Sequence, residues 1–177
     1  KGGGAWMSNF VNQSTLLDSK PVIYNVCNYT KPPAGEPALL SWDDVITMFH
    51  EFGHTLHGLF ASQRYPSLSG TETPRDFVEF PSQINEHWAS EPAVFRNYAR
   101  HYQTQALMPA ELHEKIVRAA TFNKGYEMSE LLAAALLDLH WHSLNHDSAP
   151  QSVEGFEQQA LQSDNLALTA VPPRYRS

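Results

Sequence analysis

The chain has 177 residues, with 42% hydrophobic and 18% charged side chains and a formal net charge of −7. This composition is that of an ordinary globular protein, long enough to form one sizeable core. The acidic balance argues against nucleic acid and against an anionic membrane surface as partners, and no apolar run is long enough to span a membrane. Because Cys27 is the single cysteine, no internal disulfide can form, which fits a reducing cytoplasm.

The N-terminal stretch, about residues 1–30, is the predicted β part of the chain. Residues 5–11 and 21–29 are rich in β-branched and aromatic side chains, which is typical of strands. We expect them to pair as two strands of a small sheet. The prolines and the glycine of residues 31–37 then predict a loop.

A long helix is predicted over residues 41–61. Ser41, followed three residues later by Asp44, has the spacing of a capping box and places the helix start near Trp42. Apolar side chains then recur at helical spacing, so we expect the helix to bury most of its surface. These side chains belong to Val45, Ile46, Met48, Phe49, Phe52, Leu56, Leu59 and Phe60.

Residues 50–54 of this helix read His-Glu-Phe-Gly-His. Side chains four residues apart lie on the same helix face, so the imidazoles of His50 and His54 can bind one tetrahedral metal ion. Glu51 can take a proton from a water molecule at the metal and so act as a general base. Burying these polar side chains among apolar ones is costly unless a partner compensates them. A metal ion is the simplest partner, and hydrogen-bonded core histidines are the alternative.

The third protein ligand is expected to be a carboxylate from a second helix, with water in the fourth place. Residues 76–83 offer such a carboxylate, and Pro81 fits the first turn of a following helix, so the third-ligand helix is expected within about residues 76–90. Glu79 is the favoured ligand. Glu72 and Glu86 remain rivals, because spacing alone separates the three glutamates poorly.

Further helices are predicted in the second half of the chain. The apolar run at residues 131–137 is too short to span a membrane and indicates a buried helix. The predicted helices lie near residues 91–102, 109–122, 127–145 and 152–163.

Two more polar side chains share the face of the candidate ligands on the helix over residues 41–61. Asp43, seven residues before His50, can accept the outer N–H of a ligating imidazole, or can simply be an acid that favours the helix dipole. His57 lies about 10 Å along the axis from His50 and is expected to pack rather than to bind the same ion. The other histidines, including a loose cluster at residues 140–146, are interpreted as ordinary polar residues.

Three stretches resemble the thimet-oligopeptidase family of zinc peptidases. They are residues 49–57, 69–71 and 76–83, which read FHEFGHTLH, SGT and DFVEFPSQ. The resemblance extends over essentially the whole chain and implies a mainly α-helical, zincin-like (gluzincin) catalytic core with a small β-sheet. It also implies one zinc ion bound by His50, His54 and Glu79. Glu51 would be the catalytic base.

Within this family, residues 74–88 and 122–132 most resemble the peptidyl-dipeptidases. That branch implies zinc-dependent hydrolysis of oligopeptides with release of C-terminal dipeptides. An oligopeptidase A-like endopeptidase is the alternative inside the family. A zinc-stabilised module without catalysis is the alternative outside it, although structural zinc sites usually have four protein ligands, often thiolates.

Zinc peptidases usually bind an extended substrate along an edge strand beside the zinc helix. Residues 5–9 are the candidate edge in this chain. An ordinary structural hairpin is an equally good interpretation of the same residues.

We interpret residues 1–177 as an incomplete part of one catalytic domain. Members of the family are several times longer, and they continue with a histidine and a run rich in glycine and tyrosine that binds substrate and stabilises the tetrahedral intermediate. Removing one such oxyanion donor typically costs about a hundredfold or more in rate. We therefore expect the isolated chain to bind zinc but to hydrolyse peptides poorly or not at all.

Overall fold

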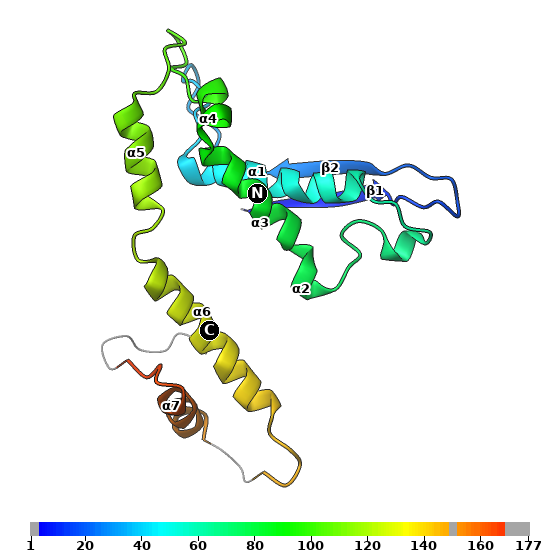
Figure 1. The fold of residues 1–177 in the computed structure, drawn as a ribbon, viewed down its shortest axis with the longest axis vertical. Coiled ribbons are helices and arrows are strands. Elements are labelled where there is room, and N and C mark those ends of the chain that lie inside the picture. The colour runs from blue at the N-terminus through cyan, green and yellow to red at the C-terminus, as the bar shows by residue number, and fades with distance from the viewer. Residues whose placement is uncertain (1–3, 149–151, 169–177) are drawn as a thin grey trace. The chain divides into compact units, whose positions relative to one another are not determined.

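A computed structural model describes residues 4–148 and 152–168 of the chain (Figure 1). The chain, predicted as part of one domain, forms two compact units, residues 1–112 and residues 113–177, and each is described by itself. The predicted mainly α-helical class with a small sheet is confirmed, because the described residues form mostly helices and one two-stranded sheet near the N-terminal end. Among these residues, no helix is long and apolar enough to cross a membrane.

The first unit is built around helix α1, which packs against both strands of the sheet and against helix α3. In chain order its described elements are β1 (Ala5–Val11), β2 (Val22–Cys27), α1 (Trp42–Leu59), the short 3-10 helix η1 (Pro66–Leu68), α2 (Arg75–Val78), α3 (Phe80–Ser90) and α4 (Pro92–Tyr98). Helix α5 (Ala110–Ala119) contains the boundary between the two units.

Strands β1 and β2 pair in antiparallel orientation, as their composition predicted. Ala5 lies opposite Cys27, and the register is regular as far as the irregularity between Asn9 and Val11. The ring of Trp6 meets the ring of Tyr24 edge to face, with 5.4 Å between the ring centroids. This diagonal aromatic contact on one face of the pair helps to fix the register.

Helix α1 begins at Trp42, where the capping box predicted it. The amide of Asp44 donates to the hydroxyl of Ser41, and the amide of Ser41 donates to the carboxylate of Asp44, each over 3.1 Å. Two orphan donors at the helix start are therefore satisfied reciprocally. The helix ends at Leu59, two residues before the predicted end.

The expected burial of the apolar side chains of α1 is wrong. The buried residues of the helix are Glu51, Gly53, His54 and Gly58, whereas the side chain of Phe52 is 49% exposed. The reason is that the neighbouring elements approach the helix at its two glycines. Small residues let the backbones come close, and the face that they occupy becomes the buried face.

Gly53 is the point of closest approach between α1 and α3. A Cβ atom at this position would lie 2.6 Å from the Cα of Ser82 and 2.7 Å from the carbonyl oxygen of Pro81. The side-chain amide of Asn85 also donates to the carbonyl of Phe49 over 2.7 Å. The two helices are thus held together by a close steric fit and by a specific hydrogen bond.

A polar network joins the loop after β1 to the loop after α1. The amides of Thr15 and Leu16 donate to the carbonyls of Gln63 and Arg64 over 3.0 and 3.1 Å. The side chain of Gln13, which is buried, accepts a hydrogen bond from the amide of Gln63 over 2.9 Å. These contacts fix the C-terminal end of α1 relative to the sheet.

The second unit contains α6 (Lys124–His142) and α7 (Val153–Ser163). Its core consists of Ala133 and Leu137 from α6 with Ala160 and Leu161 from α7. Residues 131–137 are helical, as predicted, but the helix is buried on one face only, because Ala133 and Leu137 pack on α7 while Leu131 and Leu132 are 63% and 48% exposed.

Candidate metal centre

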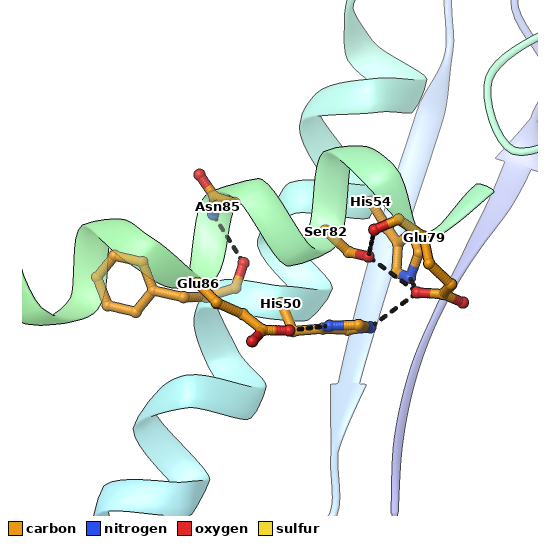
Figure 2. A network of polar contacts seen from close by, with 7 residues as sticks. His50, His54, Glu79, Ser82, Asn85 and Glu86 are labelled. Atoms are coloured by element: carbon orange, nitrogen blue, oxygen red, sulfur yellow. Dashed lines mark hydrogen bonds and ion pairs between the residues drawn. The ribbon is translucent and has the colours of Figure 1, made fainter. Parts of the chain in front are cut away.

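His50 and His54 lie one turn apart on the same face of α1, as their spacing predicted. Their ring centroids are 4.9 Å apart and the rings are nearly perpendicular, at 84°. The Nε2 atom of each imidazole lies 3.2 Å from the same atom, Oε2 of Glu79 (Figure 2). Two nitrogen atoms and one carboxylate oxygen therefore converge on a single point.

Glu79 stands at the junction of α2 and α3, where it is the last residue of one helix turn and the N-cap of the next. The hydroxyl of Ser82 donates to the carboxylate Oε2 and to the backbone oxygen of Glu79, each over 2.9 Å. Pro81 occupies the first turn of α3, as predicted. This local cap holds the Glu79 carboxylate toward α1, because α3 contacts α1 closely at Gly53.

These three side chains can hold a metal ion. Their ligand atoms all lie within 4.8 Å of one another, and they form the only such group of three or more ligating side chains within the described parts of the chain. Ligand atoms about 2.1 Å from a tetrahedral zinc ion are roughly 3.4 Å apart, close to the nitrogen–oxygen distances of this cluster. The donor set and its spacing thus fit a zinc ion.

Glu51 is buried beside the three candidate ligands, as expected for a general base that acts on a bound molecule. The residue is 6% exposed, and its Oε2 atom has no hydrogen-bond partner among the described residues. An unsatisfied buried carboxylate oxygen costs free energy in the folded state. A ligand, a water molecule or a substrate at this position would compensate that cost.

The candidate ligands line a cavity of about 350 Å³ that also reaches strand β1. Ala5, Trp6 and Met7 form its strand side, and Glu51 lines it together with the three ligating side chains. The strand predicted as a substrate edge therefore lies at the site.

A second cavity of about 370 Å³ lies on the N-terminal side of His50 and is lined in part by Glu51, Glu86 and Tyr29. Burial raises the pKa of Tyr29 well above the ordinary value of 10.0, so its hydroxyl stays protonated at neutral pH. The hydroxyl donates to the backbone oxygen of Asp44 over 3.4 Å.

The two other candidates for the third metal ligand, Glu86 and Glu72, are not part of the ligand group. Glu86 contacts the outer ring nitrogen of His50, with 2.7 Å between Oε1 and Nδ1. Glu72 is exposed, in the loop before α2, and does not belong to the ligand group. The choice of Glu79 as third ligand stays a prediction, and this geometry supports it.

The outer ring nitrogen of His50 therefore contacts Glu86 and not Asp43, the partner that the sequence suggested. Asp43 is exposed, and none of the hydrogen bonds between described residues links it to either histidine. The sequence did carry a signal for Glu86, because it lies seven residues after Glu79, almost two turns along the same helix.

Two histidines outside the ligand group, His57 and His140, contact neighbouring side chains. The ring of His57 packs edge to face on Phe77 at a centroid distance of 5.9 Å, and burial lowers its pKa below 6.5, with His54 contributing. His140 is bonded to Asp164 over 2.9 Å. The loose histidine cluster thus pairs with nearby carboxylates.

Comparison with known proteins identifies the family of this chain. The model of peptidase family M3 matches residues 1–177, and the chain belongs to that family. It is 71% identical over its whole length to dipeptidyl carboxypeptidase of Escherichia coli (strain K12) and 70% identical to dipeptidyl carboxypeptidase of Salmonella typhimurium. It is also 39% identical, over 81% of its length, to oligopeptidase A of Escherichia coli (strain K12).

The chain covers 26% of each dipeptidyl carboxypeptidase and 22% of oligopeptidase A. It therefore spans about a quarter of the length of these curated relatives.

Proposed function

We propose that this chain forms the zinc-binding catalytic core, of the zincin type, of a cytoplasmic peptidase that releases dipeptides from the C-termini of oligopeptides. The observation that carries the proposal is the convergence of His50, His54 and Glu79 beside the buried, unsatisfied carboxylate of Glu51. One side chain ready to accept a proton thus lies next to three that can hold a metal ion.

His50 and His54 would hold the ion through Nε2, and Glu79 would hold it through Oε2. When bound, zinc supplies Lewis acidity, which polarises a carbonyl group and lowers the pKa of water. Glu51 accepts the proton of the attacking water and then donates it to the amine that leaves. The burial of Glu51 keeps competing solvent away from the carboxylate during this transfer.

We propose that the substrate backbone lies along β1. The side of β1 that does not pair with β2 has no partner strand among the described residues, and Ala5, Trp6 and Met7 line the cavity of the candidate ligands. Backbone amides and carbonyls at a strand edge can hydrogen-bond an extended peptide of any sequence. Binding of this kind suits a peptidase that acts on many oligopeptides.

Release of C-terminal dipeptides is the finer part of the proposal. It is supported by the 71% identity to a dipeptidyl carboxypeptidase, which exceeds the 39% identity to oligopeptidase A. An activity like that of oligopeptidase A, the alternative, would be cleavage inside the peptide. Because the chain spans about a quarter of these relatives, we also propose that it hydrolyses peptides poorly by itself.

The test uses both the chain and a chimera. The chain alone should bind one equivalent of zinc, measured by metal analysis after dialysis, and Glu79→Gln should reduce the bound zinc. For activity, the chain replaces the matching segment of the Escherichia coli dipeptidyl carboxypeptidase, and the chimera is given a peptide with a free or an amidated C-terminus.

Dipeptide release from the free peptide alone is the expected result. Internal cleavage of both peptides would favour the endopeptidase alternative. Activity that survives Glu51→Gln in the chimera would contradict the role of Glu51. A chimera that binds zinc but cleaves neither peptide would favour the non-catalytic zinc module.

A further inference from the structure

One imidazole of the candidate metal centre contacts a carboxylate at each of its two ring nitrogens. The Nε2 atom of His50 lies 3.2 Å from Glu79, and the Nδ1 atom lies 2.7 Å from Oε1 of Glu86. Figure 2 shows these two glutamates on opposite sides of the ring. The two carboxylates therefore act on different atoms and have different roles.

We propose that Glu86 is a positioning residue that fixes the tautomer and the orientation of His50 for metal binding. This proposal rests on the proposed zinc function of the site. A neutral imidazole has one N–H and one lone pair, and of the two carboxylate contacts the one at Nδ1 is the shorter, 2.7 Å against 3.2 Å, so we assign the N–H to Nδ1. The lone pair is then on Nε2, which faces His54 and Glu79.

The position of Glu86 is set by the packing of α3 on α1. Its neighbour Asn85 is bonded to the carbonyl of Phe49, which precedes His50 in the chain. Gly53, one turn further along α1, contacts the first turn of α3 so closely that no Cβ fits. The packing of α3 on α1 therefore places the Glu86 carboxylate beside the His50 ring.

The contact is also better protected than an ordinary surface ion pair. The side chains of His50 and Glu86 are 26% and 32% exposed, and the short distance is typical of a charge-assisted hydrogen bond. Exposed pairs contribute little because water and salt screen them. Partial burial gives the Glu86 contact more influence over the orientation of the ring.

His54 lacks an equivalent partner. Its Nδ1 atom is buried and has no hydrogen-bond partner among the described residues. The orientation of the two-histidine pair therefore depends mainly on the His50–Glu86 contact, and loss of Glu86 should affect metal binding more than loss of another nearby carboxylate.

The experiment compares Glu86→Ala and Glu86→Gln with the parent chain and with the control Asp43→Asn, which removes an exposed carboxylate from the same helix as His50. Zinc affinity is measured by competition with a chromogenic chelator. The protonated nitrogen of His50 is identified in metal-free protein at alkaline pH by nitrogen-15 NMR of the imidazoles, and circular dichroism checks that each variant is folded.

Glu86→Ala should weaken zinc binding by about 10- to 100-fold, the range typical of lost partners of metal-bound histidines. The proton of His50, held on Nδ1 in the parent, should then distribute between both ring nitrogens. Glu86→Gln should lose less zinc affinity, because its amide oxygen still accepts a hydrogen bond. If Glu86→Ala is not folded, the zinc affinity of Glu86→Gln is the measurement that tests the proposal. Asp43→Asn should match the parent.

Unchanged zinc affinity in folded Glu86→Ala, or a His50 proton on Nε2 in the parent, would overturn the proposal. These failures differ from failure of the proposed function. A parent chain that holds its proton on Nδ1 but binds no zinc would contradict the peptidase proposal alone, because the tautomer is measured without metal.

Discussion

The substitution Gly53→Ala tests how closely the metal centre depends on the contact between α1 and α3. The added Cβ would lie 2.6 Å from the Cα of Ser82, whereas ordinary contact begins near 3.4 Å, so the helices would have to separate by about 0.8 Å at this point. The atoms that it meets include backbone atoms of α3, which cannot rotate away as the end of a long side chain can.

Overpacking of this kind typically costs about 1–3 kcal/mol, and the better helix propensity of alanine offsets up to about 1 kcal/mol of it. We therefore expect a net loss of about 1–2 kcal/mol in the free energy of unfolding. The first unit, residues 1–112, lies between the size classes in which each kcal/mol lowers Tm by roughly 4–8 °C and by roughly 2–4 °C, so we expect about 4 °C per kcal/mol. Zinc affinity should also fall, because separation of the helices moves Glu79 and Glu86 away from His50.

Two other glycines provide matched controls. A Cβ at Gly58 would meet mainly the side-chain ends of Ile23 and Met7, so Gly58→Ala should be tolerated better than Gly53→Ala. A Cβ at Gly125 would meet nothing within 4 Å, so Gly125→Ala should be neutral or slightly stabilising. Thermal unfolding followed by circular dichroism and chelator competition are the assays. If Gly53→Ala matched Gly125→Ala in both assays, the close contact at Gly53 would not be what positions the ligands.

The capping box and the partly buried side chains of Tyr98 and His57 give three further predictions. Ser41→Ala should lower the free energy of unfolding by about 1 kcal/mol in urea titrations, because it removes the acceptor for the Asp44 amide; no change would mean that α1 does not need this cap. Burial raises the pKa of Tyr98 from 10.0 to about 12, so stability present below pH 10 is lost as the pH rises toward 12. Tyr98→Phe should reduce that alkaline loss in unfolding curves measured from pH 9 to 12, and an identical slope would refute the assignment. The pKa of His57 is lower in the folded chain, so the unfolded chain binds the proton first and the free energy of unfolding falls as the pH drops through 6.5. His57→Phe should flatten this dependence of the free energy of unfolding on pH, and an unchanged dependence would count against burial of His57 as its cause.

The sequence predicted the elements of this fold well where the signals are local. The capping residues Ser41 and Asp44 locate the start of α1, and the β-branched and aromatic content of residues 5–11 and 21–29 predicts the two strands. The spacing of His50 and His54 places both rings on one face, because helix geometry alone decides that.

The errors come from properties that depend on neighbours distant in the sequence. The apolar period of α1 predicted that Phe52 would be buried, but the buried face was decided by the approach of α3 to Gly53 and of the sheet to Gly58. In the same way, Asp43 was a candidate partner of His50 because it lies on the same helix, whereas the actual partner, Glu86, comes from α3. Spacing along one helix says little about which side chains a second helix brings to it.

The polar network after β1 has a consequence for how the first unit opens. The amides of Thr15 and Leu16 donate to carbonyls in the loop after α1, and the related side-chain contact of Gln13 joins residues 50 positions apart in the sequence. The segment enclosed between these contacts contains β2 and α1, so closing it costs more loop entropy than closing a local turn. These amides should therefore exchange with deuterium only when the whole unit unfolds, although both lie in a loop. Their protection against exchange would measure the global stability of the unit that carries the metal centre.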